Sequence, residues 1–210
     1  MPDEFIPLVQ QTRLIKPLTL YVLDAALRQC RSWMDTGRRM RVAVNLAPRN
    51  LVDVDLPYDI ADLLRAHRVP PDLLGLEITE STVVADPRRA GAVLARLGRI
   101  GVRLSVDDFG TGYSSLSYLT RFPINEIKID RSFVTNMGSS PGAEIIVRST
   151  IDLGRNLGQE VVAGGVETAE VLSRLEELGC HLAQGYHVSR PLPIEELDVW
   201  LAASASLSTK

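Results

Sequence analysis

Short runs with the composition of β-strands alternate with longer amphipathic stretches along the sequence, and this alternation restricts the chain to the α/β class. The expected strands are residues 41–47, 74–78, 102–106, 126–129, 160–163 and 181–186. The expected helices include residues 18–34, 57–67, 88–97, 142–156, 168–178 and 194–203. Strand and helix units of this length indicate parallel strands with crossover connections, which leads to a doubly wound sheet or a (β/α) barrel.

Start and stop residues mark several of the expected helices. Pro87 and Pro141 stand where a proline fits the first helical turn. Glycines suited to a left-handed cap follow four helical runs, at Gly37, Gly101, Gly158 and Gly179. No GxGxxG motif follows the first strand, which weakens the dinucleotide-binding alternative.

The composition indicates one globular domain. Of the 210 residues, 45% are hydrophobic, and the net charge of −3 arises from 23 basic and 26 acidic residues scattered along the chain. No basic stripe marks a protein that grips duplex nucleic acid. The acidic start is unlike a signal peptide, no apolar run approaches the ~20 residues that span a bilayer, and the two cysteines are far apart. We expect a soluble cytoplasmic protein without a membrane partner.

Polar residues gather at the carboxyl ends of the expected strands. In chain order they are Asn45, Glu77, Glu80, Asp107, Asp108, Lys128, Asp130, Glu167 and Gln184. In a (β/α) barrel the carboxyl ends of all strands meet at one rim, so these side chains would face a single acidic pocket. The alternative is that each carboxylate caps the next helix or forms a surface ion pair. Agreement at six successive strand ends favours a shared site.

Four of these residues carry hard oxygen donors, namely Asn45, Glu77, Asp107 and Asp108, and no cysteine or histidine accompanies them. This set suits Mg²⁺ or Mn²⁺ rather than zinc. Paired divalent ions suit an in-line displacement at phosphorus, so phosphodiester hydrolysis follows as a hypothesis.

Lys128 alternates with Ile127 and Ile129 in its expected strand, so its side chain points to the opposite face from theirs. In a barrel that face is the interior, where an ammonium group needs a partner. The alternative is a solvated lysine on an edge strand.

Several runs together resemble the EAL domain family, the bacterial hydrolases of cyclic di-GMP. They are VNLA at 44–47, LEITES at 76–81, DDFGTGYSSLSYL at 107–119, IKIDRSF at 127–133, GVET at 165–168 and QGYHVSRPLP at 184–193. The resemblance runs in order from about residue 3 to about residue 201. It implies a TIM-like (β/α)₈ barrel in which two metal ions help to cut cyclic di-GMP to the linear dinucleotide.

The resemblance also implies roles for individual residues. Asn45, Glu77, Asp107 and Asp108 are similar to metal ligands, and Lys128 is similar to the lysine that positions the attacking water. Glu80 resembles the glutamate that holds the loop at 109–115, which in the family lies beside the metals and the dimer contact. Three further residues resemble groups that support the ligands or line the rim, namely Asp130, Glu167 and Gln184.

The sequence departs from the family pattern in two places. The Glu-Ala-Leu motif itself is absent, and with it the resemblance implies the loss of two strands, a metal-binding glutamate and an arginine used on the substrate phosphate. Gly164 occupies the position of the glutamate assigned as general base. A competing interpretation of Gly164 and Gly165 is that they let backbone amides approach a phosphate. Glycine still cannot take a proton.

We therefore expect an incomplete EAL-type barrel over residues 1–203, with about six of eight strands, and a flexible tail over 204–210. The expected function is that of a degenerate module with little or no phosphodiesterase activity, a weakened Mg²⁺ or Mn²⁺ site and cyclic di-GMP as a ligand. Its unpaired strand edges predict a homodimer or a protein partner that covers them. The alternative is an active phosphodiesterase whose first strands lie upstream of an incorrectly chosen start codon. A metal-dependent aldolase is disfavoured because it would not predict DDFGTGYSS.

Overall fold

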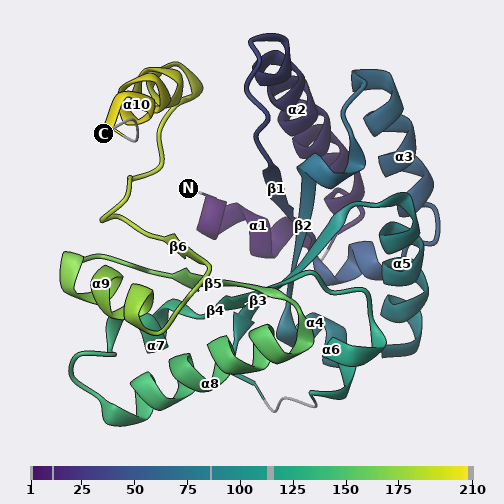
Figure 1. Ribbon diagram of the computed structural model, residues 1–210. Helices are drawn as coiled ribbons and strands as arrows, with labels where there is room; N and C mark the ends of the chain where they lie inside the picture. Colours follow the sequence, from purple (N-terminus) through teal and green to yellow (C-terminus); the bar gives the residue numbers. More distant parts are fainter. Residues whose placement is uncertain (1, 11, 86, 113–115, 208–210) are drawn as a thin grey trace.

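The computed structural model describes residues 2–10, 12–85, 87–112 and 116–207, and a parallel sheet forms its centre (Figure 1). The strands are β1 Val42–Asn45, β2 Leu74–Thr79, β3 Arg103–Phe109, β4 Glu126–Ile129, β5 Glu160–Gly164 and β6 Leu182–Gln184. They lie side by side in sequence order, and each neighbouring pair is parallel. The prediction of a six-stranded, incomplete TIM-like barrel is confirmed.

Helices and short 3₁₀ turns connect the strands. They are α1 Pro2–Gln10, α2 Ile15–Asp35, η1 Pro48–Val52, α3 Leu56–His67, η2 Pro71–Leu73, α4 Glu80–Ala85, α5 Pro87–Ile100, α6 Ser117–Arg121, α7 Arg131–Thr135, α8 Pro141–Leu157, α9 Ala169–Glu177 and α10 Ile194–Leu207. The long helices match the expected segments within a few residues. The helices α1, α4, α6 and α7 were not expected, because fewer than three turns give little helical period to detect.

Local sequence signals set the ends of the long helices. Pro141 opens α8, and the Ser140 hydroxyl caps it by accepting a hydrogen bond from the backbone N–H of Ala143. Gly158 closes the same helix in the left-handed conformation, with φ of 67°. Pro87 opens α5 in the same way. The expected proline starts and glycine stops are therefore confirmed.

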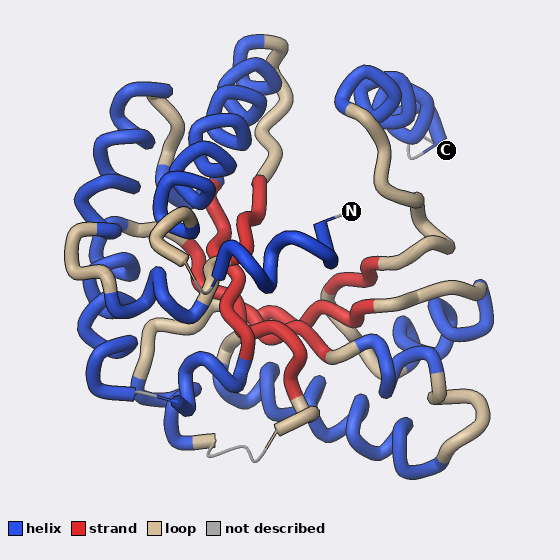
Figure 2. Tube along the Cα trace, turned by 180° about the vertical axis from the view of Figure 1, so that it is seen from behind, coloured by secondary structure: helices blue, strands red, loops and turns tan. Residues whose placement is uncertain are grey.

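The long helices α2, α3, α5 and α8 lie along the outer face of the curled sheet, whereas α1 lies within the curl (Figure 1 and Figure 2). Alternate residues of each strand point outward into this layer, such as Leu74, Leu76 and Ile78 of β2, which are all fully buried. The residues between them, Gly75 and Glu77, point to the inner face and are half-buried. This alternation divides the molecule into an apolar outer core and a polar inner face.

β3 is longer than predicted, because Asp107 and Asp108 belong to the strand rather than follow it. The pairing with β4 shifts between Val106 and Phe109, which is a bulge or irregularity in the ladder. Asp108 has a left-handed φ of 55°, which aspartate tolerates better than most residues. A register shift of this kind re-aims the side chain at the irregular position, so the carboxylates of Asp107 and Asp108 have different surroundings.

β1 and β6 are the two edges of the sheet, and they do not pair with each other. Figures 1 and 2 show the open side between β1, flanked by α2, and β6, which leads to α10. β6 is shorter than the predicted strand 181–186, and its Leu182 is 42% exposed. The side chains of Trp33 and Asp198 join α2 to α10 by a hydrogen bond of 2.8 Å between Nε1 and Oδ1.

The carboxyl end of the chain differs from the expectation. α10 continues to Leu207, four residues beyond its predicted end at 203. Residues 208–210 of the expected tail lie outside the described residues. Within the residues that the structure describes, no helix is long and apolar enough to cross a membrane.

An ion-pair cluster ties three strands together at the amino end of the sheet. Glu160 begins β5, and its Oε2 accepts a hydrogen bond of 2.9 Å from Arg41, which precedes β1. The same carboxylate pairs with Arg103 at the start of β3. The cluster thus connects the edge strand β1 to the interior of the curl.

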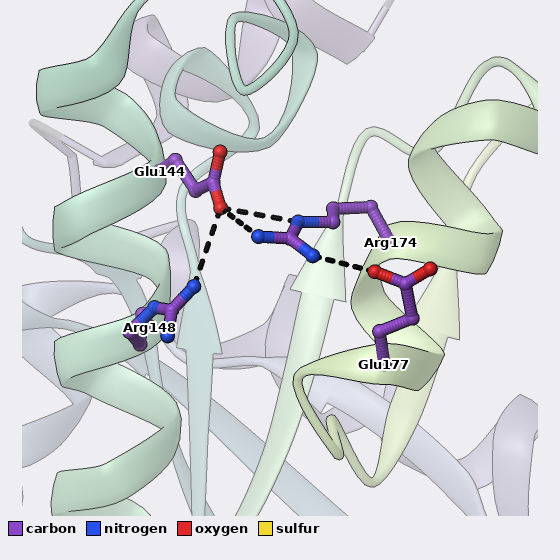
Figure 3. Close-up of polar contacts among 4 residues, drawn as sticks. All are labelled: Glu144, Arg148, Arg174 and Glu177. Atoms are coloured by element: carbon purple, nitrogen blue, oxygen red, sulfur yellow. Dashed lines mark hydrogen bonds and ion pairs between the residues drawn. The ribbon is translucent and has the colours of Figure 1, made fainter.

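A second ion-pair network joins α8 to α9 (Figure 3). The guanidinium of Arg174 lies between Glu144 of α8 and Glu177 of α9, and its Nε is 3.1 Å from Oε1 of Glu144. Arg148 approaches the same Glu144 oxygen at 3.5 Å. These side chains are partly or largely exposed, so the network holds α9 in place from the surface.

Candidate active site

Three charged side chains from neighbouring strands meet on the inner face of the sheet. The Lys128 ammonium on β4 lies 2.8 Å from Oε2 of Glu77 on β2 and 3.4 Å from Oδ2 of Asp107 on β3. Lys128 is only 8% exposed, whereas Ile127 and Ile129 point to the outer core. The predicted inward orientation of Lys128 is confirmed, and its partners are two carboxylates.

Burial and charge act against each other in this cluster. Burial raises the pKa of Glu77, and the positive charge of Lys128 only partly opposes this effect. Burial lowers the pKa of Lys128, but the carboxylates of Glu77 and Asp107 outweigh it, so the pKa lies above its ordinary value. Lys128 therefore stays protonated and acts as a fixed cation rather than as a base.

A cavity of about 320 Å³ opens beside this cluster at the carboxyl ends of the strands β3 to β6. The residues expected from the sequence that line it are Asp107, Asp108, Lys128, Asp130, Gly164, Glu167 and Gln184. Partial desolvation and the neighbouring carboxylates of Asp107 and Asp130 raise the pKa of Asp108. Closely spaced negative charges of this kind attract a cation.

Gly164 ends β5 and lies opposite Gln184 of β6 in the ladder. Its backbone is not in the left-handed region, and a Cβ built there would lie 3.1 Å from the carbonyl oxygen of Ile129. A side chain at this position thus needs only a small adjustment of its neighbour. Gly165 differs, because its φ is 80° and a Cβ built there would lie only 2.6 Å from Cβ of Arg131, so this position requires glycine.

Glu80 lies at the start of α4, directly after β2, and is 2% exposed. Its Oε2 accepts a hydrogen bond of 3.1 Å from the backbone N–H of Gly110, and Gly112 lies beside the same carboxylate. Glu80 thereby contacts the first part of the loop at 109–115 that it was expected to hold. Residues 113–115 of that loop lie outside the described residues.

The expected metal site consists of Asn45 and three carboxylates on the neighbouring strands. Asn45 is exposed on the edge strand β1 and pairs in register with Glu77. Within the described ranges, no three His, Cys, Asp or Glu side chains are arranged to hold a metal ion. The donor types of Asn45, Glu77, Asp107 and Asp108 fit a hard divalent cation. Lys128 already supplies positive charge between two of them, so a metal ion would compete with it.

Arg131 and Tyr186 also line the cavity, and neither is among the site residues expected from the sequence. Arg131 is the first residue of α7, with only Asp130 between it and the end of β4, and Tyr186 follows β6 with the Arg190 guanidinium 4.6 Å from its ring centroid. Both lie in runs that resemble the family, IKIDRSF and QGYHVSRPLP. Arg131 could have been found from its position just after an expected strand end, whereas Tyr186 lay inside the expected strand 181–186.

The fold and the site define a class of protein, the TIM-like (β/α) barrels whose polar residues gather at the carboxyl ends of the strands. Within this class the chain belongs to the EAL domain family, because the family model matches residues 1–191. The membership predicted from the sequence is confirmed.

Curated relatives are similar over nearly the whole chain. The signaling protein YkoW of Bacillus subtilis is 40% identical over 98% of this chain and 26% of its own length. The bifunctional diguanylate cyclase/cyclic di-GMP phosphodiesterase MucR of Pseudomonas aeruginosa is 41% identical over 93% of this chain and 29% of its own length. The chain therefore spans about a quarter to a third of the curated relatives it matches.

Solved structures agree with this assignment. The structure of the PaMucR phosphodiesterase in complex with c-di-GMP has a TM-score of 0.90 and 41% identity, covering 94% of this chain and 80% of that chain. The EAL domain of Mycobacterium smegmatis DcpA has a TM-score of 0.84 and 38% identity, covering 89% of this chain and 84% of that chain.

Proposed function

We propose that this EAL domain has little or no cyclic di-GMP phosphodiesterase activity as the 210-residue chain, and that it acts as a nucleotide-binding or protein-interaction module. The observation that carries the proposal is Gly164, which lines the cavity at the position where the family pattern has its general base. Loss of a general base typically slows an enzyme by ~10²–10⁴-fold. The 210 residues contain no Glu-Ala-Leu run, and the proposed low activity is that of these residues alone.

Cyclic di-GMP is the proposed ligand, because relatives of this family are named as its phosphodiesterases and the PaMucR structure holds it. The cavity presents the Arg131 guanidinium and the Tyr186 ring, which suit a phosphate and a base respectively. The carboxylates Asp107 and Asp108 repel a phosphate unless a cation lies between. We therefore expect binding to be weak and to depend on Mg²⁺ or Mn²⁺.

The polar residues of the site have separate proposed roles when a metal ion is bound. Asn45, Glu77, Asp107 and Asp108 would hold the ion, which would supply positive charge to the phosphate oxygens. Lys128 keeps its proton and orients a water molecule or phosphate oxygen by donating a hydrogen bond. Glu80 positions the following loop through Gly110.

The alternative is an active phosphodiesterase, and a specific observation favours it. Lys128 and its carboxylate partners remain in contact inside the half-barrel, so much of the polar machinery is in place. Glu167 also lines the cavity, three residues beyond Gly164, where a shift of the loop would bring it to the position of the missing base.

Hydrolysis and binding measured on the same sample separate the two functions. We expect cyclic di-GMP turnover near background, together with calorimetric binding that strengthens when Mg²⁺ or Mn²⁺ is added. Rapid hydrolysis by the unmodified chain that is abolished by Glu167→Gln would contradict the proposal and assign the base to Glu167. Absence of any binding would leave protein interaction as the function.

The unpaired edges of β1 and β6 support a homodimer or a protein partner, because an unpaired strand offers free N–H and C=O groups to another chain. Sedimentation velocity tests this part of the proposal. We expect self-association or precipitation of the isolated chain, reduced by Leu182→Lys at the β6 edge. A monodisperse monomer that unfolds cooperatively would contradict it.

A further inference from the structure

We propose that the groove between α3 and α5 on the outside of the half-barrel is a docking site for an acidic amphipathic helix of a partner protein. Three adjoining cavities of about 350, 190 and 210 Å³ form the groove. Ala61 and Ile100 line the first two, and Arg96 and Arg99 line the last two, so the groove is continuous. Figure 1 shows α3 and α5 as neighbours in the outer helical layer. None of the lining residues belongs to the candidate active site.

The groove has the size and floor of a helix-binding site. It follows α3 from Pro57 to Arg68, which corresponds to about 16 Å or three helical turns. Its floor is apolar, with buried Leu64 and Val69 and half-buried Ile100. An amphipathic helix binds such a groove through its apolar face.

The rim of the groove carries positive charge only. Four arginines line it, namely Arg65, Arg68, Arg96 and Arg99, and no acidic residue among the described ones does. Arg65 pairs with Asp62 on its own helix. In the described part of the chain, Arg68 and Arg99 form no ion pair although both are exposed. A partner with glutamate or aspartate beside its apolar face would neutralise these two guanidinium groups.

Arg96 and Tyr58 form an ordered pair at the middle of the groove. Arg96 donates hydrogen bonds of 3.1 Å to the carbonyl oxygen of Val54 and 2.8 Å to the Tyr58 hydroxyl, and its guanidinium lies 4.9 Å from the Tyr58 ring centroid. Tyr58 is nevertheless 59% exposed. Arginine and tyrosine are the residue types that dominate binding energy at protein interfaces, and this pair needs little further ordering.

The same arginines also attract phosphates, so nucleic acid is the rival occupant. The apolar floor between two helices favours a helix, because a nucleic acid would leave that floor uncovered. The net charge of −3 for the chain also weakens long-range attraction of a polyanion. A second copy of this chain is the other rival, since α10 begins with Glu195 and Glu196.

Fluorescence anisotropy tests the proposal with a labelled peptide of about four helical turns that carries leucine on one face and glutamate on both flanks. We expect saturable binding that weakens with added salt, and no binding of a matched peptide with lysine in place of glutamate. Arg68→Glu combined with Arg99→Glu should weaken peptide binding at least about tenfold. Ala61→Trp should weaken binding to a similar extent, because the indole ring would occupy the apolar floor of the groove. The double variant breaks no ion pair, so it should fold normally, which its melting temperature verifies.

Arg13→Glu combined with Arg121→Glu is the matched control, because it changes the net charge equally at two exposed sites outside the groove that form no ion pair within the described residues. Equal loss of binding in this control would show that overall charge alone attracts the peptide and would overturn the proposal. Equal affinity for the lysine peptide would do the same, as would tighter binding of a single-stranded oligonucleotide. Self-association that Arg68→Glu/Arg99→Glu abolishes would assign the groove to a second copy instead.

Discussion

The Nζ atom of Lys128 lies 2.8 Å from Oε2 of Glu77, so an ammonium group from β4 neutralises a carboxylate from β2 inside the half-barrel. Asp107 of β3, the strand between them, takes part at 3.4 Å. The three strands are held in one place by an internal cation that the chain supplies itself. This contact explains how carboxylates that are expected to bind a metal ion tolerate burial when no metal ion is bound.

Lys128→Met should therefore destabilise the fold and increase its response to metal ions. Removing the ammonium leaves Glu77 and Asp107 without a nearby cation, and we expect a loss of about 3 kcal/mol in the free energy of unfolding. Mg²⁺ or Mn²⁺ should raise the melting temperature of this variant more than that of the unmodified chain. Addition of Asp107→Asn should remove the extra response. A melting temperature that metal ions do not change would refute the site.

Gly164→Glu should not restore full hydrolysis by itself. The position accepts a side chain with a small shift of the Ile129 carbonyl, so the variant should fold. The metal-binding glutamate implied by the family pattern is still missing, so turnover should stay well below that of an active EAL domain. A chain extended upstream by the two family strands and carrying Gly164→Glu should hydrolyse cyclic di-GMP. Full activity of Gly164→Glu alone would show that the 210 residues contain a complete metal site.

Glu160→Gln should lower stability at neutral pH and lose its effect in acid. The hydrogen bond from Arg41 holds the pKa of Glu160 below its usual range, with the charge of Arg103 acting in the same direction. A lowered pKa contributes stability above the unfolded value of about 4.3 and loses it as the pH falls through the folded value. We expect a difference of about 1 kcal/mol at pH 7 that narrows below about pH 4 in urea titrations. A difference independent of pH would contradict the ionic origin.

Arg174→Ala should loosen α9 without changing the sheet. Leu175 of α9 is buried and Val171 and Leu172 pack partly against the core, and the contact of Arg174 with Glu144 adds a polar attachment of α9 to α8 (Figure 3). We expect a decrease in melting temperature of about 2 °C and faster amide exchange in α9. Arg148→Ala is the control, because its contact with Glu144 is longer and its loss leaves Arg174 in place. Equal effects of the two substitutions would argue against a special role of Arg174.

Features that depend on neighbouring residues were predicted well. The alternation around Lys128 placed its side chain on the inner face, since successive residues of a strand point to opposite sides. Pro141 and Gly158 marked the ends of α8, because a proline fits the first turn and glycine adopts the left-handed cap. The ends of the expected strands located most of the cavity lining for the same reason, since a strand end can be recognised from the strand itself.

Features that depend on distant residues were decided by the tertiary structure. The sequence by itself determined that Lys128 points inward, but only the register of β2, β3 and β4 decided that Glu77 and Asp107 are its partners. Likewise, the curl of the sheet brings Arg41 to Glu160 across 119 residues. The local sequence pattern indicates to which face of its own strand or helix each side chain points. It contains no information about how neighbouring elements are aligned, and that alignment sets every contact in the site.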